Sequence, residues 1–259
     1  MSTKTLITGA STGIGATYAD RFARRGHDLV LVARDAARME ALAAKLRAET
    51  GVAIDILPAD LTRDTDIARV EKRLREDAEI GILVNNAGAG LFGGFADQSS
   101  ADIARLITLN TTSVAQLANA AASRFAAEGR GAIINIASVV GLVPEFGMSV
   151  YGATKAFVIF LSQGLTFELG PKGVFVQVVL PSGTWTELWE RGGLDPATLL
   201  QPMMDVNDLV DAALVGFDRR EAITIPPLPD AALWDAYQTA RQAMMPGFGN
   251  PQPAARYRA

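Results

Sequence analysis

Cysteine is absent from this sequence of 259 residues, and histidine occurs once, as His27. Without cysteine there is no disulfide, no thiol nucleophile and no cysteine ligand for a metal. One histidine makes no metal-binding cluster, and nothing near His27 in the sequence resembles a partner for a Ser-His catalytic pair. We therefore expect no metal, and a chemistry that relies on neither of these side chains.

Long runs of charge and long apolar stretches are missing too. The chain has 24 basic and 28 acidic residues, giving a net charge of −4, which leaves no basic footprint for nucleic acid and no polybasic membrane patch. The N-terminus lacks the apolar run of a signal peptide, and no uncharged apolar stretch reaches the ~18 residues of a membrane span. We expect a cytoplasmic protein that binds neither nucleic acid nor membrane.

Short apolar runs alternate with amphipathic stretches along the whole chain. Hydrophobic residues make up 49% and charged residues 20%, a balance typical of a globular protein. Unbroken apolar strands between helices are what a parallel sheet covered on both faces requires. We predict one α/β domain over residues 1–259, a Rossmann-like doubly wound parallel sheet with helices on both faces. About seven strands are expected, at 6–8, 29–33, 54–57, 80–84, 132–136, 174–180 and 222–225.

Two segments fall outside this alternation. Residues 182–204 form part of the longest stretch without a predicted strand, and we expect them to be a substrate loop or lid. Residues 246–259 are predicted to be an irregular tail, because their Pro and Gly residues fit neither a regular helix nor a central strand.

A glycine-rich segment, Thr8-Gly9-Ala10-Ser11-Thr12-Gly13-Ile14-Gly15, stands between the first predicted strand and the first helix. Glycine lets a pyrophosphate approach the backbone, and the helix start offers free N–H groups to phosphate. The alternative is a tight turn without a ligand. The residues predicted to hold the cofactor here are Gly9, Ser11, Thr12, Gly13, Ile14 and Gly15.

The end of the second strand carries the choice of cofactor. An acidic residue there binds the ribose 2′-hydroxyl of NAD, but this strand ends Val32-Ala33-Arg34. A guanidinium pairs with a 2′-phosphate, so Arg34 favours NADP(H) over NAD(H). Asp35 is the alternative, because a shift of one residue would bring a carboxylate to the ribose.

Tyr151 and Lys155 are four residues apart in a predicted helix and so share one face. A phenol has a pKa near ~10, and a neighbouring ammonium or an oxidised nicotinamide is expected to lower it. Ser138 follows the strand at 132–136, where its hydroxyl would reach a substrate oxygen. Asn85-Asn86-Ala87-Gly88 follows the fourth strand, and Asn110 lies in the next helix.

With these motifs in this order, the chain resembles the short-chain dehydrogenase/reductase family from Lys4 to about Pro181, and more weakly to about Ile225. The resemblance implies that Tyr151 is the general acid and base, that Lys155 holds the nicotinamide ribose and lowers the pKa of Tyr151, and that Ser138 orients the carbonyl. Asn110 would hold a water linking Lys155 to solvent. Further cofactor contacts implied by the resemblance are Asp60, Leu61, Asn86, Ala87, Gly88, Tyr151, Lys155, Pro181, Gly183 and Thr184.

Two details qualify the match. Asn86 either lines the cofactor or ties neighbouring strands together. Ser182 stands where the family usually has the glycine of a Pro-Gly pair. The cofactor contacts expected of Pro181, Gly183 and Thr184 therefore lie in a loop that departs from the family pattern.

The candidate substrate walls are apolar, which favours a hydrophobic ketone or aldehyde over a sugar. They are Leu91, Phe92, Val139, Val140, Leu142, Phe146, Trp185, Leu188, Trp189, Met203 and Met204. We therefore predict NADPH-dependent reduction of an apolar carbonyl compound, reversible as alcohol oxidation. A non-catalytic dinucleotide sensor of the same fold is the alternative, and a nucleotide-sugar dehydratase or epimerase is disfavoured by the short, apolar substrate region.

The helix predicted at 149–169 contains five consecutive apolar residues, Phe157 to Leu161. They cover every face of a helix, and one sheet cannot bury them all. We expect a homodimer or homotetramer through this helix and the one near Asn110, as the resemblance also implies.

Overall fold

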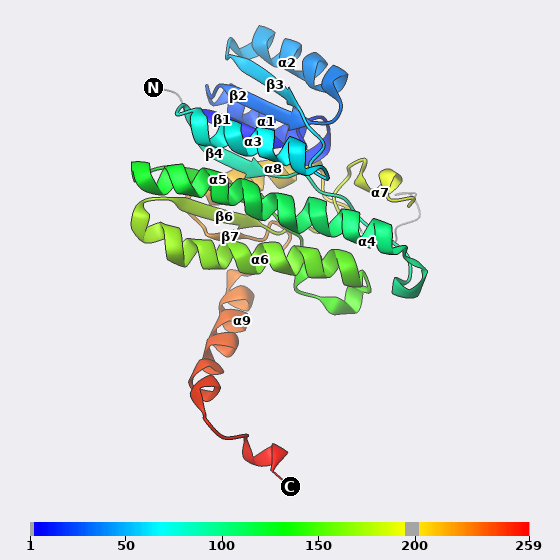
Figure 1. Cartoon of the computed structure of the whole chain (residues 1–259), viewed down its shortest axis with the longest axis vertical. Helices are drawn as coiled ribbons and strands as arrows, with labels where there is room; N and C mark the ends of the chain where they lie inside the picture. The colour runs from blue at the N-terminus through cyan, green and yellow to red at the C-terminus, as the bar shows by residue number, and fades with distance from the viewer. Residues whose placement is uncertain (1–2, 195–201, 259) are drawn as a thin grey trace. The chain divides into compact units, whose positions relative to one another are not determined.

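The computed structural model describes residues 3–194 and 202–258. It divides into two compact units, Met1–Pro226 and Pro227–Ala259, which are described separately. The first unit contains a seven-stranded sheet of order β3-β2-β1-β4-β5-β6-β7, in which every paired strand is parallel to its neighbour (Figure 1). The strands are β1 (Lys4–Thr8), β2 (Leu29–Ala33), β3 (Ile54–Pro58), β4 (Ile80–Asn85), β5 (Ala132–Ile136), β6 (Phe175–Val179) and β7 (Ile223–Thr224). The predicted Rossmann-like α/β fold with seven strands is confirmed.

The strand order reverses beside β1, because β2 follows on one side and β4 lies on the other. In open α/β sheets the crevice that binds ligands lies beyond the carboxyl ends of the strands at such a reversal of strand order, here beside β1 and β4. Both sequence motifs predicted to hold a dinucleotide begin at these two strand ends.

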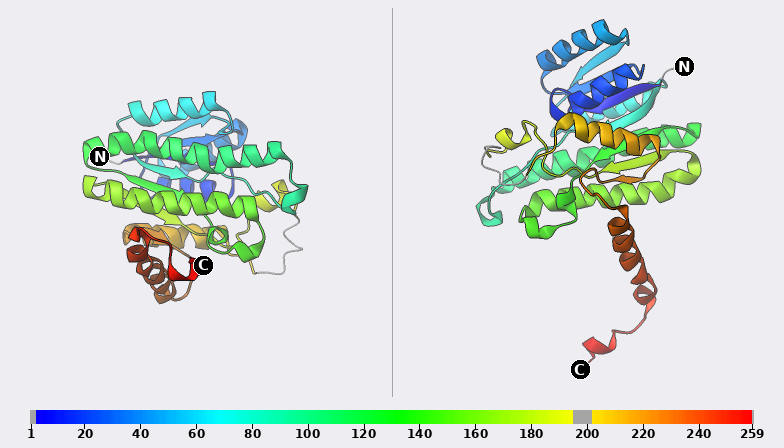
Figure 2. Two further views of the ribbon diagram at one scale, coloured as in Figure 1. Left: turned by 60° about the horizontal axis from the view of Figure 1, so that its bottom comes forward. Right: turned by 180° about the vertical axis from the view of Figure 1, so that it is seen from behind.

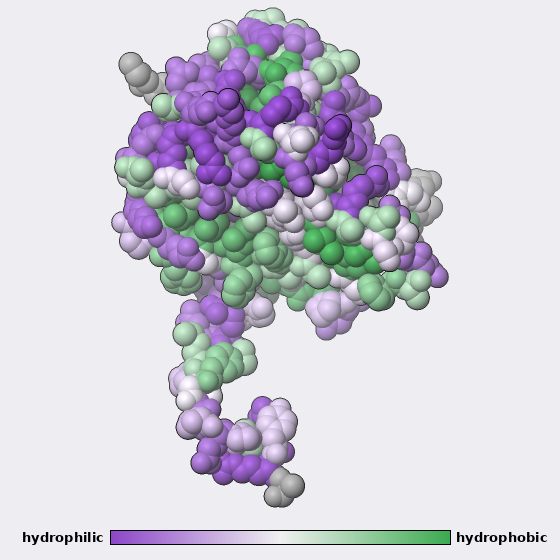
Figure 3. Space-filling model, in the orientation of Figure 1, coloured by the Kyte–Doolittle hydropathy of each residue, from purple (hydrophilic) through white to green (hydrophobic). Residues whose placement is uncertain are grey.

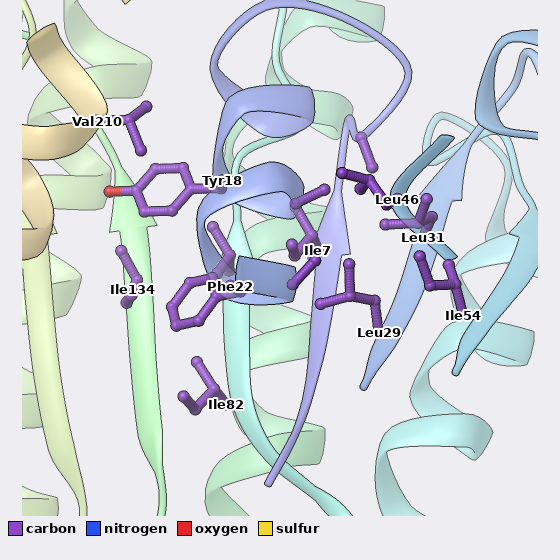
Figure 4. Packing of buried hydrophobic residues seen from close by; sticks show 14 of the residues in the cluster. Ile7, Tyr18, Phe22, Leu29, Leu31, Leu46, Ile54, Ile82, Ile134 and Val210 are labelled. Atoms are coloured by element: carbon purple, nitrogen blue, oxygen red, sulfur yellow. The ribbon is translucent and has the colours of Figure 1, made fainter. Parts of the chain in front are cut away.

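Helices cover both faces of the sheet (Figures 1 and 2). One face carries α1 (Gly13–Arg24), α2 (Ala36–Thr50) and α8 (Val206–Asp218), and the other carries α3 (Asp64–Glu76), α5 (Ser113–Glu128) and α6 (Ser149–Leu169). On the α1 face, the rings of Tyr18 and Phe22 pack between the helix and the strands, both 1% exposed (Figure 4). Strand side chains alternate between the two cores, which explains why the strands are mostly apolar on both faces.

Shorter helices complete the first unit. Helix α4 (Ser100–Ile107) runs through a π-helical turn, Thr108–Thr112, into α5, and α7 (Leu188–Arg191) lies within the predicted lid. Part of that lid, 195–201, lies outside the described residues.

Helix α6 buries only part of its apolar surface within this chain. Val158 and Ile159 are 1% and 4% exposed, whereas Phe160 and Phe167 are 81% and 76% exposed. Figure 3 shows apolar surface over the region of the first unit where α5 and α6 lie. The apolar residues of α6 therefore form two faces, one buried in this chain and one exposed and aromatic.

The second unit is built around α9 (Ala231–Ala243), whose first turn is capped by Asp230 accepting a hydrogen bond from Ala232 N at 2.9 Å. The sequence analysis assigned no helix to this segment, so α9 was missed. Two short 3₁₀ turns follow, Met245–Gly249 and Ala255–Tyr257. Among the described residues of this unit no side chain is buried. The extension of a single domain beyond Pro226 remains a prediction.

Across the described ranges, none of the helices is both long enough and apolar enough to cross a membrane.

Candidate active site

The glycine-rich loop leaves β1 and enters α1 as predicted. Gly9 and Gly13 have φ of 66° and 54°, a region that favours glycine. A Cβ on Gly9 would lie 2.9 Å from Ala87 Cα, and one on Gly15 would lie 2.3 Å from Gly9 O. Thr12 is the N-cap of α1, and its side chain makes no capping hydrogen bond. The first N–H groups of α1 thus remain suited to an anionic ligand such as a pyrophosphate.

Thr8 joins this loop to the loop after β4, a role that the sequence analysis missed. Its Oγ1 accepts hydrogen bonds from Asn86 N at 2.9 Å and Ala87 N at 3.0 Å, and donates to Val84 O at 3.3 Å. Asn86 in turn donates through Nδ2 to Thr8 O at 2.9 Å. Asn86 therefore ties neighbouring strand ends together, which was one of its two predicted roles. A threonine at the last position of the first strand was the available signal.

The region expected to hold the adenosine ribose begins where β2 ends, at Ala33, so that Arg34 is the first residue beyond the strand and is exposed. Asp35 caps α2 instead, with Oδ1 accepting from Arg38 N at 3.0 Å. This geometry favours Arg34 over Asp35 as the residue nearest a 2′-phosphate. Asp60 follows β3; its Oδ1 accepts from Thr62 N and Thr62 Oγ1, and Leu61 beside it is buried.

An ion pair that the sequence analysis did not anticipate connects this region to the predicted lid. Arg38 Nη1 donates to both carboxylate oxygens of Glu187, at 2.8 and 2.9 Å, and Arg191 Nη2 donates to the same carboxylate at 2.7 Å. The two guanidinium groups lower the pKa of Glu187, with Arg38 the larger cause. Next to Glu187, Thr186 lies over the phosphate loop, since a Cβ on Gly13 would be 3.1 Å from Thr186 Cγ2.

Ser138, Tyr151 and Lys155 meet beside this crevice. Ser138 caps a 3₁₀ turn, accepting from Val140 N at 3.2 Å and donating to Pro181 O at 3.2 Å. Lys155 Nζ donates to Ile136 O at 3.0 Å and lies 5.6 Å from the centroid of the Tyr151 ring. Tyr151, Lys155 and Ser138 are only 7–8% exposed. The structure thus brings together the three residues that the sequence analysis placed after β5 and on α6.

Burial governs the pKa values of this group. It raises the pKa of Tyr151 to about 12, and a hydrogen bond with Ser138 offsets part of the rise. Burial also lowers the pKa of Lys155 to about 8. In the protein alone the pKa of Tyr151 is therefore raised, because desolvation of the phenolate is the largest cause, and the lowering expected from Lys155 remains a prediction.

Asn110 lies in the π-helical turn and is 1% exposed. Its side chain brackets Ala89, accepting from Ala89 N at 3.0 Å and donating to Ala89 O at 3.0 Å, and it also donates to Thr154 Oγ1 at 3.1 Å. A Cβ on Gly88 would lie 3.3 Å from Asn110 Oδ1 and 3.6 Å from Lys155 Nζ. Asn110 therefore joins the loop after β4 to the helix that carries Tyr151 and Lys155.

The loop after β6 closes the site through Pro181, whose carbonyl oxygen also accepts from Val139 N at 2.9 Å. Beyond it, Gly183 O accepts from Met204 N at 2.9 Å, and Thr184 is buried with its Oγ1 donating to Ser182 O at 3.0 Å. Trp189 Nε1 donates to Thr184 O at 2.8 Å, so α7 is fixed to this loop. The side chain of Thr184 is thus engaged within the loop itself.

Apolar side chains border the group of Ser138, Tyr151 and Lys155. Tyr151 packs in one cluster with Leu91 and Val140, and Phe92 stacks on Trp189 with ring centroids 5.5 Å apart. Phe146 and Trp185 are about half exposed. No group of three or more acidic or histidine side chains able to hold a metal occurs among the residues that the structure describes.

Comparisons with known proteins agree with this geometry. A family model described as short chain dehydrogenase matches residues 3–195. Among curated proteins, the chain is 36% identical over 181 residues to a very-long-chain 3-oxoacyl-CoA reductase of Danio rerio, and 35% identical over 178 residues to 17-beta-hydroxysteroid dehydrogenase type 3 of Mus musculus. These matches cover 68% of this chain and 56% and 58% of the relatives, so the chain spans less than two thirds of their length.

Two solved structures match the chain almost from end to end. One is a short-chain dehydrogenase from Sphingobium yanoikuyae in complex with NADPH, 64% identical with a TM-score of 0.97, the match covering 99% of this chain and 100% of that one. The other is a bulky-bulky ketone specific alcohol dehydrogenase from Comamonas testosteroni, 57% identical with a TM-score of 0.92, with 99% of both chains covered. On the family match and these relatives, the chain belongs to the short-chain dehydrogenase family.

Proposed function

We propose that this protein is an NADPH-dependent oxidoreductase that reduces ketones and aldehydes with apolar substituents, with Tyr151 as the proton donor. The observation that carries the proposal is the buried group of Ser138, Tyr151 and Lys155 beside the crevice between β1 and β4. A dinucleotide sensor would need the crevice but not this acid–base group, and no observation favours that alternative.

The residues present fit a dinucleotide. Gly9 and Gly13 leave the backbone of the phosphate loop open, and the start of α1 has N–H groups without a side-chain cap. When bound, NADPH supplies the hydride. Arg34, exposed directly after β2, would pair with the 2′-phosphate, and Lys155 would hold the nicotinamide ribose.

The protein's own groups would supply orientation and the proton. The hydroxyl of Ser138 would donate a hydrogen bond to the substrate carbonyl oxygen, and Tyr151 would transfer its phenol proton to that oxygen. The raised pKa of Tyr151, about 12, keeps the phenol protonated at neutral pH, as a general acid requires. Lys155, with a pKa of about 8, is close enough to neutral pH to pass a proton toward Tyr151.

A hydrophobic carbonyl substrate is supported by the apolar cluster at Leu91 and Val140 and by the Phe92–Trp189 stack. The named relatives support the same class, since one is described as specific for bulky-bulky ketones. The choice between ketone and aldehyde is left to a substrate screen with NADPH.

Replacing Tyr151 by Phe tests the proposal. We expect NADPH-dependent turnover of an apolar ketone to fall by at least about 100-fold, the usual scale of a lost general acid, with NADPH binding retained by fluorescence titration. Unchanged turnover in this variant would overturn the mechanism. The cofactor preference has its own test: Arg34→Ala should weaken NADPH binding about tenfold and leave NADH binding within twofold, whereas equal effects on both would contradict a 2′-phosphate contact.

We also propose that the exposed aromatic face of α6 forms a subunit interface in a homodimer or homotetramer. Phe160 and Phe167 are exposed in the single chain, and a face of this kind is costly to leave in water. Phe160→Asp should lower the mass measured by analytical ultracentrifugation at micromolar concentration. A wild-type protein that sediments as a monomer would refute this interface.

A further inference from the structure

Thr154 is a buried hydroxyl that lies between Tyr151 and Lys155 in the sequence and is 3% exposed. Neither the motif nor the proposed mechanism gives it a role. Its Oγ1 donates to Tyr151 O at 2.7 Å and accepts from Asn110 Nδ2 at 3.1 Å. The hydroxyl thus donates one hydrogen bond to Tyr151 and accepts one from Asn110, both of which belong to the proposed site.

From these contacts we propose that Thr154 is a positioning residue, which fixes the π-helical turn carrying Asn110 against the helix carrying Tyr151 and Lys155. The inference rests on the proposed function, because it concerns the geometry of that site. Thr154 does not touch the reacting atoms, and it acts through Asn110 and the Tyr151 backbone.

The π-helical turn explains why such a fixed point is needed. A π turn interrupts the regular α-helical hydrogen bonding between α4 and α5, and Asn110 is the middle residue of this turn. Its amide is held by three hydrogen bonds outside the turn, two to Ala89 and one to Thr154. The Thr154 bond is the one of these that reaches α6, and it therefore transmits the position of the turn to Tyr151.

The same bonds connect to the proposed cofactor side. Ala89 follows Gly88, and a Cβ on Gly88 would meet both Asn110 Oδ1 and Lys155 Nζ within 3.6 Å. If Asn110 loses its bond to α6, the spacing between Lys155, Gly88 and the Tyr151 hydroxyl is no longer fixed at this point. Small displacements of reacting groups lower the catalytic rate more than they lower binding.

Two variants of Thr154 separate the hydroxyl from the shape of the side chain. Thr154→Val keeps the β-branched shape and removes the hydroxyl, whereas Thr154→Ser keeps the hydroxyl. For Thr154→Val we expect kcat for ketone reduction to fall about fivefold to tenfold, the loss of one hydrogen bond, with KM changed less than threefold and the pH dependence of kcat shifted. Thr154→Ser should retain kcat within about twofold.

Thr166→Val is the matched control. Thr166 is also on α6, and its Oγ1 donates to Ser162 O at 2.9 Å, without a contact to the proposed site. It should lower the melting temperature by no more than Thr154→Val does, because Thr166 is partly buried and makes this one bond, and it should leave the pH dependence of kcat unchanged. Should Thr154→Val fold poorly, Thr154→Ala removes the same hydroxyl with a side chain that favours helix.

The proposal is overturned if Thr154→Val keeps the wild-type kcat and pH dependence, or if Thr154→Ser loses as much activity as Thr154→Val. It is also overturned if Thr154→Val lowers only the melting temperature, since that result assigns the hydroxyl to folding alone. Loss of the proposed function itself would show differently, as unchanged turnover in Tyr151→Phe.

Discussion

Replacing Gly9 by Ala should damage the protein in two separable ways. At φ 66° an L-residue loses roughly 1–2 kcal/mol relative to glycine, and the new Cβ would lie 2.7 Å from Asn86 Nδ2 and 2.9 Å from Ala87 Cα. The second contact involves backbone, which cannot rotate away as a side chain does, so overpacking adds about 1–3 kcal/mol. We therefore expect a total loss of roughly 2–5 kcal/mol in the free energy of unfolding.

Gly51 provides the matched control, because its φ is 75° and a Cβ there would meet nothing within 4 Å. Gly51→Ala measures backbone strain alone. At about 2–4 °C per kcal/mol for a domain of this size, it should lower the melting temperature by about 2–8 °C, and Gly9→Ala by about 4–20 °C. Gly9→Ala alone should also weaken NADPH binding, measured by cofactor fluorescence. Equal melting temperatures for the two variants, with unchanged NADPH binding, would refute the close approach of the two loops.

Three further outcomes follow from burial in the structure. With the pKa of Tyr151 raised to about 12 in the protein alone, ketone reduction should stay level with pH up to about 8, where Lys155 begins to lose its proton, while alcohol oxidation, which needs the phenolate, should rise with pH; initial rates in both directions between pH 6 and 10 test this, and oxidation that falls with pH over this range contradicts it. Burial lowers the pKa of Lys155 from 10.5 to about 8, so between these pH values the unfolded chain holds more protons and native stability rises with pH. Lys155→Met should accordingly raise the melting temperature at pH 7, since it removes a charge whose burial costs up to about 3 kcal/mol of unfolding free energy. The gain should shrink toward pH 10, and thermal scans at both pH values measure it. Deleting residues 227–259 should leave the far-UV circular dichroism of the α/β domain and its melting temperature nearly unchanged, because the described side chains of that unit are not buried; a molten or aggregated product would show otherwise.

The parts of the fold that the sequence predicts are those governed by local pattern. Strand β2 is an unbroken apolar run and β5 is apolar except for Asn135, because side chains on both faces are buried, and the bounds of both strands match the predicted ones. Tyr151 and Lys155 share a side of α6 because four residues are about one helical turn. Helix α9 escaped prediction because its apolar residues, such as Leu233 and Tyr237, are interspersed with small and polar ones and are exposed.

The contacts that the sequence does not predict join residues far apart in the chain. Arg38 and Glu187 are separated by 149 positions, and each reads on its own as a surface charge. The role of Thr8 as the junction of two loops likewise depends on β1 and β4 being neighbours, which only the strand order establishes. Local residue patterns therefore predicted which loops would hold a cofactor, and the topology was needed to show how those loops are held together.

The largest difference between the sequence prediction and the structure concerns the pKa of Tyr151, and it bears on the direction of the proposed reaction. Counting charges along the helix suggests that an ammonium favours the phenolate, but Lys155 is itself buried and its ammonium donates to Ile136 O. Burial favours the neutral form of both groups, which raises the pKa of the phenol and lowers that of the amine. A phenol that stays protonated at neutral pH is ready to donate and must first lose its proton before it can accept one. In the proposed mechanism, the protein alone therefore keeps Tyr151 ready to donate a proton to a carbonyl, and alcohol oxidation relies on the positive charge of the oxidised nicotinamide to favour the phenolate.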